Sequence, residues 1–202
     1  MDAYQSEIFE FLTARDNFDS FVKLSSHYEK VKEELLKNFW RLVDRKLRSR
    51  TRDMDWLVSF DANIFAGNSK LQMYKRSWMA GARPMLSIVW EGLSANPYRG
   101  LLLYMDTKGF DMQAARVQAV EIAPNGFKTY SSQWWAWWAN GALDFTTPKG
   151  VSGILPDKSG ETAKEWAEEL YGLAITHEVQ LDGIVSSTRA VSQAGFVTGD
   201  KI

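Results

Sequence analysis

The sequence predicts a single α+β domain, in which N-terminal and C-terminal helices pack on a mainly antiparallel sheet of about five or six strands. Apolar residues recur at steps of three and four between Val31 and Leu47 and alternate at every second position from Trp56. Helical spacing returns after Thr162. The connections between Trp56 and Met105 are too short for the crossovers of a parallel sheet, so we expect antiparallel neighbours.

The first fifty residues predict two helices. Ile8, Phe11 and Leu12 give the first an apolar face, and the segment 16–19 is the expected break. Ser26 and Glu29 have the spacing of a capping box, which predicts that the second helix begins there. The broad apolar stripe that follows must lie on another element, and we expect that element to be the sheet.

Four strands are expected next, separated by turn-forming clusters rich in glycine, proline and asparagine; they span residues 56–64, 71–76, 85–91 and 99–105. The segment 111–122 mixes helix-forming and β-branched residues, and we interpret it as a helix. A final helix is expected to start near Thr162, where Glu165 again has capping-box spacing, with Gly172 and Gly183 weakening it.

We expect these elements to form one domain, because no repeat, low-complexity block or linker divides the chain. Its predicted parts are helical residues 1–50, sheet-rich residues 55–150, C-terminal helical residues 159–190 and a frayed tail at 191–202.

The composition of the 202-residue chain narrows the function classes. It contains no cysteine, which excludes disulfides, thiolate zinc sites, iron–sulfur clusters and cysteine nucleophiles. The N-terminus has no apolar run of the length that a signal peptide or membrane span requires, so we expect a cytoplasmic protein without a membrane partner. The net charge of −1 argues against a general polyanion binder, and no cofactor is expected.

Charge is unevenly distributed, with a basic zone and an acidic C-terminal zone that can pair within the fold or between copies in a homo-oligomer. The basic zone contains Arg41, Arg45, Lys46, Arg48, Arg50 and Arg52 against the single acid Asp44. One interpretation is a solvated helix end, where cations meet the negative end of the helix dipole. The other is a nucleic-acid partner, with these cations along the phosphates and Trp78, Trp90 or later tryptophans stacked on unpaired bases.

Four tryptophans within five positions are the least common feature of the chain: Trp134, Trp135, Trp137 and Trp138. Such a cluster is either part of the core or a binding face, because indole combines a large apolar area with an N–H group that needs a partner. Consecutive side chains on a strand cannot all face inward, whereas on a helix Trp134, Trp137 and Trp138 would share one face. We therefore expect at least one of the four at the surface, where it can contribute to an interface.

No residue constellation identifies a reaction. Neither His27 nor His177 has a catalytic context, and nucleophile-elbow, dinucleotide and phosphate-loop motifs are absent from the sequence. The one arrangement that suggests chemistry is Glu91 with Asp106 and Lys108, which fits the spacing of a magnesium-dependent PD-(D/E)XK nuclease. The same Asp-Thr-Lys-Gly segment also fits a hairpin turn, which is our preferred interpretation.

The order of aromatic and glycine residues supports a resemblance. Phe39-Trp40, the strands 74–78 and 86–91 and the segment 98–101 together resemble the C-terminal region of prokaryotic and phage proteins grouped with PD-(D/E)XK nucleases. In those proteins the region follows the nuclease motif. The resemblance therefore implies an accessory or recognition part without the catalytic portion, and it places Asp106 and Lys108 outside the motif.

These observations lead us to expect a non-catalytic binding protein with a protein partner. The resemblance adds a prokaryotic or phage origin and a role as accessory or inhibitor in phage–host defence. The predicted binding residues are the four clustered tryptophans together with Arg45, Arg48 and Arg50. The alternatives are a metal-dependent nuclease and a protein that binds nucleic acid without cleaving it.

Overall fold

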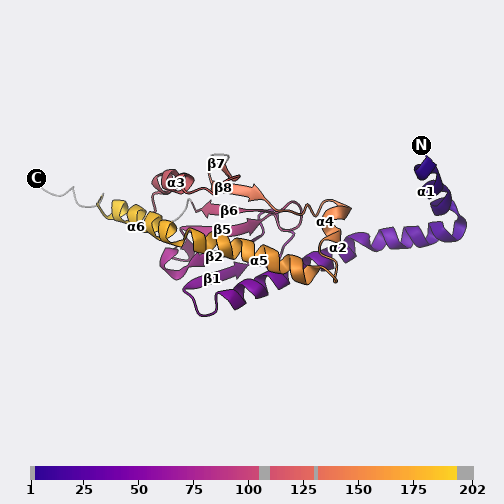
Figure 1. Cartoon of the computed structure of the whole chain (residues 1–202), viewed down its shortest axis with the longest axis horizontal. Coiled ribbons are helices and arrows are strands. Elements are labelled where there is room, and N and C mark those ends of the chain that lie inside the picture. The colour runs from indigo at the N-terminus through magenta and orange to yellow at the C-terminus, as the bar shows by residue number, and fades with distance from the viewer. Residues whose placement is uncertain (1–2, 105–109, 130–131, 195–202) are drawn as a thin grey trace, which may run out of the picture.

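A computed structural model describes residues 3–104, 110–129 and 132–194 of the chain. They form a six-stranded sheet with helices packed on it, which confirms the α+β class (Figure 1). Six helices are described: α1 (Ala3–Thr13), α2 (Arg15–Arg50), α3 (Met112–Glu121), α4 (Pro148–Ser152), α5 (Ser159–Thr176) and α6 (Glu178–Ala194). None of the helices formed by these residues has an apolar stretch long enough to cross a bilayer.

The sheet has the order β1-β2-β5-β6-β8-β7, and every neighbouring pair is antiparallel, as the short connections predict. Its strands are β1 (Trp56–Phe60), β2 (Lys70–Lys75), β5 (Leu86–Glu91), β6 (Tyr98–Leu103), β7 (Lys128–Thr129) and β8 (Trp135–Asn140). Between β2 and β5 lie a short 3-10 turn, Arg76–Trp78, and a small hairpin of β3 (Met79–Ala80) and β4 (Arg83–Pro84).

The N-terminal helices differ from the prediction. Ala14 has extended backbone angles, φ −60° and ψ 131°, so the break between the helices precedes the predicted segment 16–19. Ser26 lies inside α2, where its hydroxyl donates to the Lys23 carbonyl at 2.8 Å. The predicted capping box is therefore wrong, because a cap requires an extended residue at a helix start and α2 continues unbroken through this position.

The two halves of α2 have different surroundings. The second half packs on the sheet beside α5 and completely buries most of the predicted stripe, namely Leu36, Phe39, Trp40, Val43 and Leu47, whereas Val31 at its start is 56% exposed. The first half projects away from the body of the molecule and carries α1 at its far end (Figure 1).

Aromatic side chains join the sheet to the helices that cover it. The Trp166 ring of α5 stacks on the Trp90 ring of β5 at a centroid distance of 4.3 Å and on Phe145 at 5.7 Å. Phe39 and Trp40 of α2 meet Trp166 edge to face at 5.3 and 5.4 Å. The Trp90 indole N–H donates to the Trp166 carbonyl at 3.2 Å, so this polar group is satisfied inside the core.

A buried charge attaches α6 to the sheet. The Lys75 ammonium of β2 lies 2.5 Å from Glu178 and 2.6 Å from Asp182, and Asp182 also accepts from the Trp78 indole at 2.7 Å. Burial alone lowers the pKa of Lys75, but the hydrogen bonds to the two carboxylates outweigh it and raise the pKa above 10.5. This lysine therefore stays charged at neutral pH and holds α6 in place.

The C-terminal helices run further than expected. The chain turns at His177, between α5 and α6, while Gly172 and Gly183 lie inside helices. Helix α6 continues through Ala194, beyond the predicted end at residue 190, and residues 195–202 lie outside the described chain. The segment predicted as a helix near residue 111 is α3, capped by the Asp111 carboxylate, which accepts from the Ala114 amide at 3.0 Å.

Candidate binding surface

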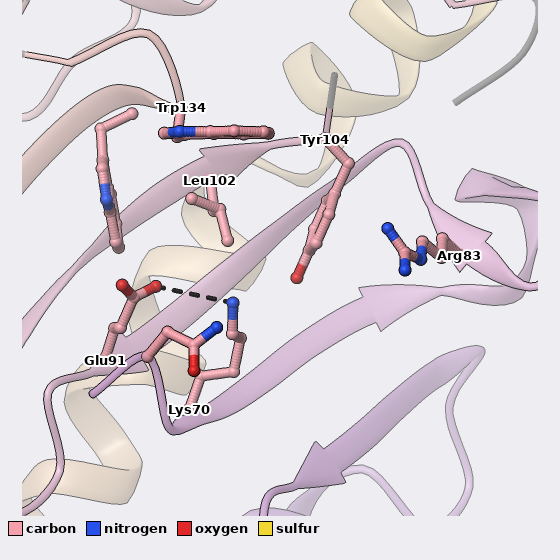
Figure 2. Close-up of a pocket in the computed structure, with 8 residues that line it drawn as sticks. Lys70, Arg83, Glu91, Leu102, Tyr104 and Trp134 are labelled. Carbon is pink, nitrogen blue, oxygen red and sulfur yellow. Dashed lines mark ion pairs between the residues drawn. The ribbon is translucent and has the colours of Figure 1, made fainter. Parts of the chain in front are cut away.

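No helix among the described residues covers one face of the sheet. Ile88 and Trp90 of β5 point into the main core with the helices, whereas Val89 between them belongs to a separate cluster with Leu102 and Trp135. That cluster contains no helical residue, and Tyr98, Tyr104 and Trp138 pack around it. We call this surface the open face; in Figure 2 the helices lie behind the sheet and the open face points toward the viewer.

A β-bulge decides which tryptophans reach the open face. Leu101 of β6 pairs with Trp137 of β8, but the next residue, Leu102, pairs with Trp135, which leaves Ala136 as the extra residue. Strict alternation would turn the side chains at 135 and 137 to the same side. With the bulge, Trp137 enters the main core while Trp135 joins the opposite cluster.

The tryptophan cluster thus serves both core and surface. Trp137 is completely buried and Trp135 nearly so, whereas Trp134 remains 39% exposed, which confirms the expectation of at least one indole at the surface. Trp138 is half-buried on the open face, with the Lys128 ammonium 4.5 Å from its ring centroid.

A hollow of about 380 Å³ opens between these aromatic side chains (Figure 2). Its lining consists of Asn68, Lys70, Arg83, Glu91, Leu102, Tyr104, Trp134 and Trp135. Trp134 and Tyr104 stand at two sides of the hollow above Leu102, and the Arg83 guanidinium lies beside Tyr104 at its rim. Pockets of this size accept a large side chain or a small ligand.

The polar groups of the hollow are connected to one another. Lys70 and Glu91 form an ion pair at 3.7 Å, and the Tyr98 hydroxyl donates to Glu91 at 2.9 Å. The Tyr104 hydroxyl donates to the Gln72 carbonyl oxygen. Burial raises the pKa of Tyr98 and raises the pKa of Tyr104 to about 12, and the negative charge of Glu91 adds to both shifts. Both phenols therefore remain protonated donors at neutral pH.

The predicted nuclease arrangement is only partly described. Glu91 lines the hollow, but its carboxylate is already engaged by Lys70 and Tyr98. Asp106 and Lys108 lie outside the described residues. Within residues 3–104, 110–129 and 132–194, no three acidic or histidine side chains gather as a set of metal ligands.

The basic zone divides in two. Arg41, Arg45, Arg48 and Arg52 line an open hollow of about 640 Å³ on the outward side of α2, and we call these four residues the arginine stripe. Arg48 pairs with Asp44 at 2.8 Å, while Arg50 donates to Glu168 of α5 at 2.8 Å. The basic and acidic zones thus pair within the fold at Arg50.

The structure separates the arginine stripe from the aromatic surface. The stripe lies on the outer side of a helix that covers the sheet, whereas Trp134 and Trp138 lie on the opposite, open face. Trp78 and Trp90 are completely buried, so neither presents a ring to an unpaired base. Lys46 is half-buried and does not line the arginine hollow.

The sequence did not single out Tyr98, Leu102 or Tyr104 as site residues. The sequence shows that these three residues stand at even-numbered positions of one strand segment and therefore share one of its sides. It does not show which side the helices cover. The chain matches no family model, no curated protein and no solved structure. The candidate surface therefore rests on the geometry of these residues, and the resemblance to PD-(D/E)XK accessory regions stays a prediction.

Proposed function

We propose that this protein is a non-catalytic binding protein and that a partner protein docks on its open face. The observation that carries the proposal is Trp134, a partly exposed indole at a hollow on a sheet face that no described helix covers. Tryptophan, tyrosine and arginine are the residues most enriched at the energetic centres of protein interfaces. Trp134, Tyr104 and Arg83 bring all three types to one hollow.

The charges at the hollow favour a protein over a nucleic acid. Lys70 and Arg83 are accompanied by Glu91, whose ion pair with Lys70 leaves little positive charge for a phosphate backbone. A protein segment can instead place an apolar side chain between Trp134 and Tyr104 and meet the mixed charges at the rim with its own polar groups.

We expect Trp134→Ala to weaken partner binding about 30-fold, because truncating a central interface residue costs about 2 kcal/mol or more. The partner would be captured from the native host with immobilised protein, identified by mass spectrometry and titrated by calorimetry. Arg83→Ala is expected to weaken the same complex.

The control is Val117→Ala, which removes an exposed apolar side chain from α3, away from the open face. This variant is expected to bind the partner as tightly as the unmodified protein. Equal affinities for Trp134→Ala and Val117→Ala would refute the open face as the interface.

The biological setting is proposed from the resemblance alone. It suggests a prokaryotic or phage protein that acts as an accessory or inhibitor in phage–host defence. The cytoplasmic location also stays a prediction, as does the alternative nuclease built on Glu91, Asp106 and Lys108.

A second candidate function, binding to a nucleic-acid backbone, is favoured by the arginine stripe. Arg41, Arg45 and Arg48 follow one another at steps of four and three residues, so they share one side of α2 over roughly 10 Å, and Arg52 lies just beyond the end of the helix. Asp44 is the one carboxylate in the lining of this hollow. Such a row of guanidinium groups can contact several successive phosphates.

For this function, we expect DNA affinity to fall steeply as salt is raised, since each arginine–phosphate contact releases counterions. Replacing Arg45 and Arg52 together by alanine should reduce the slope of log affinity against log salt by about 2. Fluorescence anisotropy with a labelled oligonucleotide measures both quantities.

Arg50→Ala is the matched control, because Arg50 is engaged by Glu168 and does not line the hollow. Its salt slope should equal that of the unmodified protein. A slope that changes as much in the control as in the double variant would exclude the stripe as the contact surface.

A further inference from the structure

The projecting half of α2 carries a second apolar row, distinct from the stripe that packs on the body. Phe21, Leu24, Tyr28, Val31 and Leu35 follow one another at steps of three, four, three and four residues. This is the spacing of the a and d positions of a coiled coil, where each side chain packs between those of a neighbouring helix. We call this row the heptad seam.

The heptad seam has no partner within the described chain. Phe21, Leu24, Tyr28 and Val31 are between 41% and 73% exposed, and only Leu35, next to the body, packs on the main core. Figure 1 shows why: this part of α2 extends away from the sheet, and α1 meets it only at its far end. A monomer rarely exposes a continuous row of large apolar side chains to water. Large contiguous apolar patches usually mark interaction sites.

We propose that the heptad seam pairs with the same seam of a second copy, in antiparallel orientation. An antiparallel register centred on Ser26 sets Phe21 opposite Val31 of the second copy, and Leu24 opposite its Tyr28. The seams of the two copies then face each other along their length and are related by one two-fold axis, as an isologous dimer requires. This register places the two globular bodies at opposite ends of the paired helices.

The surface around the heptad seam is suited to a second copy of the chain. A hollow of about 380 Å³ lies along α2 and is lined mainly by apolar atoms of residues that include Val31 and Leu35. In the antiparallel register Phe21 of the second copy reaches this hollow. The exposed apolar side chains of α1, among them Phe9 and Phe11, extend the same surface.

The exposed apolar area of α1 and the first half of α2 is close to the area that each copy buries in a stable dimer. Nine apolar side chains on α1 and the first half of α2 are between 41% and 73% exposed: Ile8, Phe9, Phe11, Phe18, Phe21, Val22, Leu24, Tyr28 and Val31. With about 150–250 Å² for a full aromatic side chain, the seven other than Phe18 and Val22, which point away from the seam, offer ~700 Å² per copy, close to the ~800 Å² that one partner contributes to a specific interface.

A membrane surface is a poorer occupant. Helices that lie in a membrane interface carry lysine and arginine on their polar side, which attract anionic lipids. The projecting segment carries mixed charges instead, with Glu7, Glu10, Asp19 and Glu29 beside Lys23 and Lys30, so it lacks the net positive charge that attracts such lipids. The heptad seam and the open face are separate surfaces, so an experiment can refute the dimer without refuting the docking of a partner on the open face, and the reverse.

The first experiment measures the mass of the full-length protein by size-exclusion chromatography with light scattering. We expect twice the chain mass of 23.0 kDa. Leu24→Glu combined with Val31→Glu should give the single-chain mass with an unchanged circular dichroism spectrum, whereas the control Val117→Glu on α3 should remain a dimer. A single-chain mass for the unmodified protein at micromolar concentration, or a dimer that survives the double substitution, would overturn the proposal.

The second experiment tests the register and uses the absence of native cysteine. A protein with both Phe21→Cys and Val31→Cys should form a disulfide-linked dimer on mild oxidation. Each single substitution should not, because the two equivalent residues lie ten positions apart along the pair, about 15 Å, beyond the reach of a disulfide. Single variants that link as readily as the double variant would show parallel pairing and refute the antiparallel dimer.

Discussion

Trp166→Ala is expected to lower the free energy of unfolding by about 3–5 kcal/mol, the usual cost of removing a large aromatic side chain from a core. Trp166 contacts four aromatic rings, from α2, from β5 and from the loop that contains Phe145. Alanine would leave a cavity where α2, α5 and the sheet meet. Urea denaturation followed by far-ultraviolet circular dichroism measures the loss without relying on tryptophan fluorescence.

Trp134→Ala is the matched control, since it makes the same chemical change at an indole that is 39% exposed. Its expected cost is at most about 1 kcal/mol, because a partly exposed side chain leaves no enclosed cavity. If the two variants lost equal stability, the aromatic core around Trp166 would not have the importance that its contacts indicate.

The fold class could be predicted because burial imposes a period on the sequence. Leu36, Phe39 and Trp40 follow the helical period and are buried together on the sheet. Val89 and Trp90 are both buried, one on each face of the sheet, as expected for a central strand. The mixed segment at 111–122 became a helix with an Asp111 cap, a local signal that the sequence already contained.

The boundaries of α2 could not be predicted, because a local signal competed with a longer one. Ser26 and Glu29 have the spacing of a cap, but apolar residues on both sides of Ser26 continue the helical period. A serine inside a helix satisfies its hydroxyl by donating to a carbonyl one turn earlier, as Ser26 does with Lys23. The same local sequence therefore suits a cap and a helix interior.

The candidate surface was predictable in composition but not in geometry. The tryptophan cluster was evident, yet its division between core and open face depends on the bulge at Ala136. A bulge is a property of two paired strands, and the sequence of β8 alone does not show where its register with β6 shifts. Tyr98 and Tyr104 acquire their importance only from neighbours on other strands.

Gly100→Ala is expected to destabilise the protein by at least about 3 kcal/mol, because it adds an atom where two backbones are in contact. A Cβ at position 100 would lie 2.7 Å from the Trp138 Cα and closer still to the Trp137 carbonyl oxygen. Backbone atoms cannot rotate away as a flexible side chain can, so β6 and β8 would have to separate. The same separation would disturb the bulge that turns Trp135 to the open face.

Gly172→Ala provides the control, since Gly172 lies inside α5 and a Cβ there meets nothing within 4 Å. Alanine should stabilise this helix by up to about 1 kcal/mol, because glycine is the poorer helix former. Urea denaturation of both variants measures the expected loss and gain of stability. Binding of the captured partner to the folded fraction of Gly100→Ala tests the role of the open face. A Gly100→Ala protein as stable as the Gly172→Ala protein would show that β6 and β8 do not approach as closely as their pairing indicates.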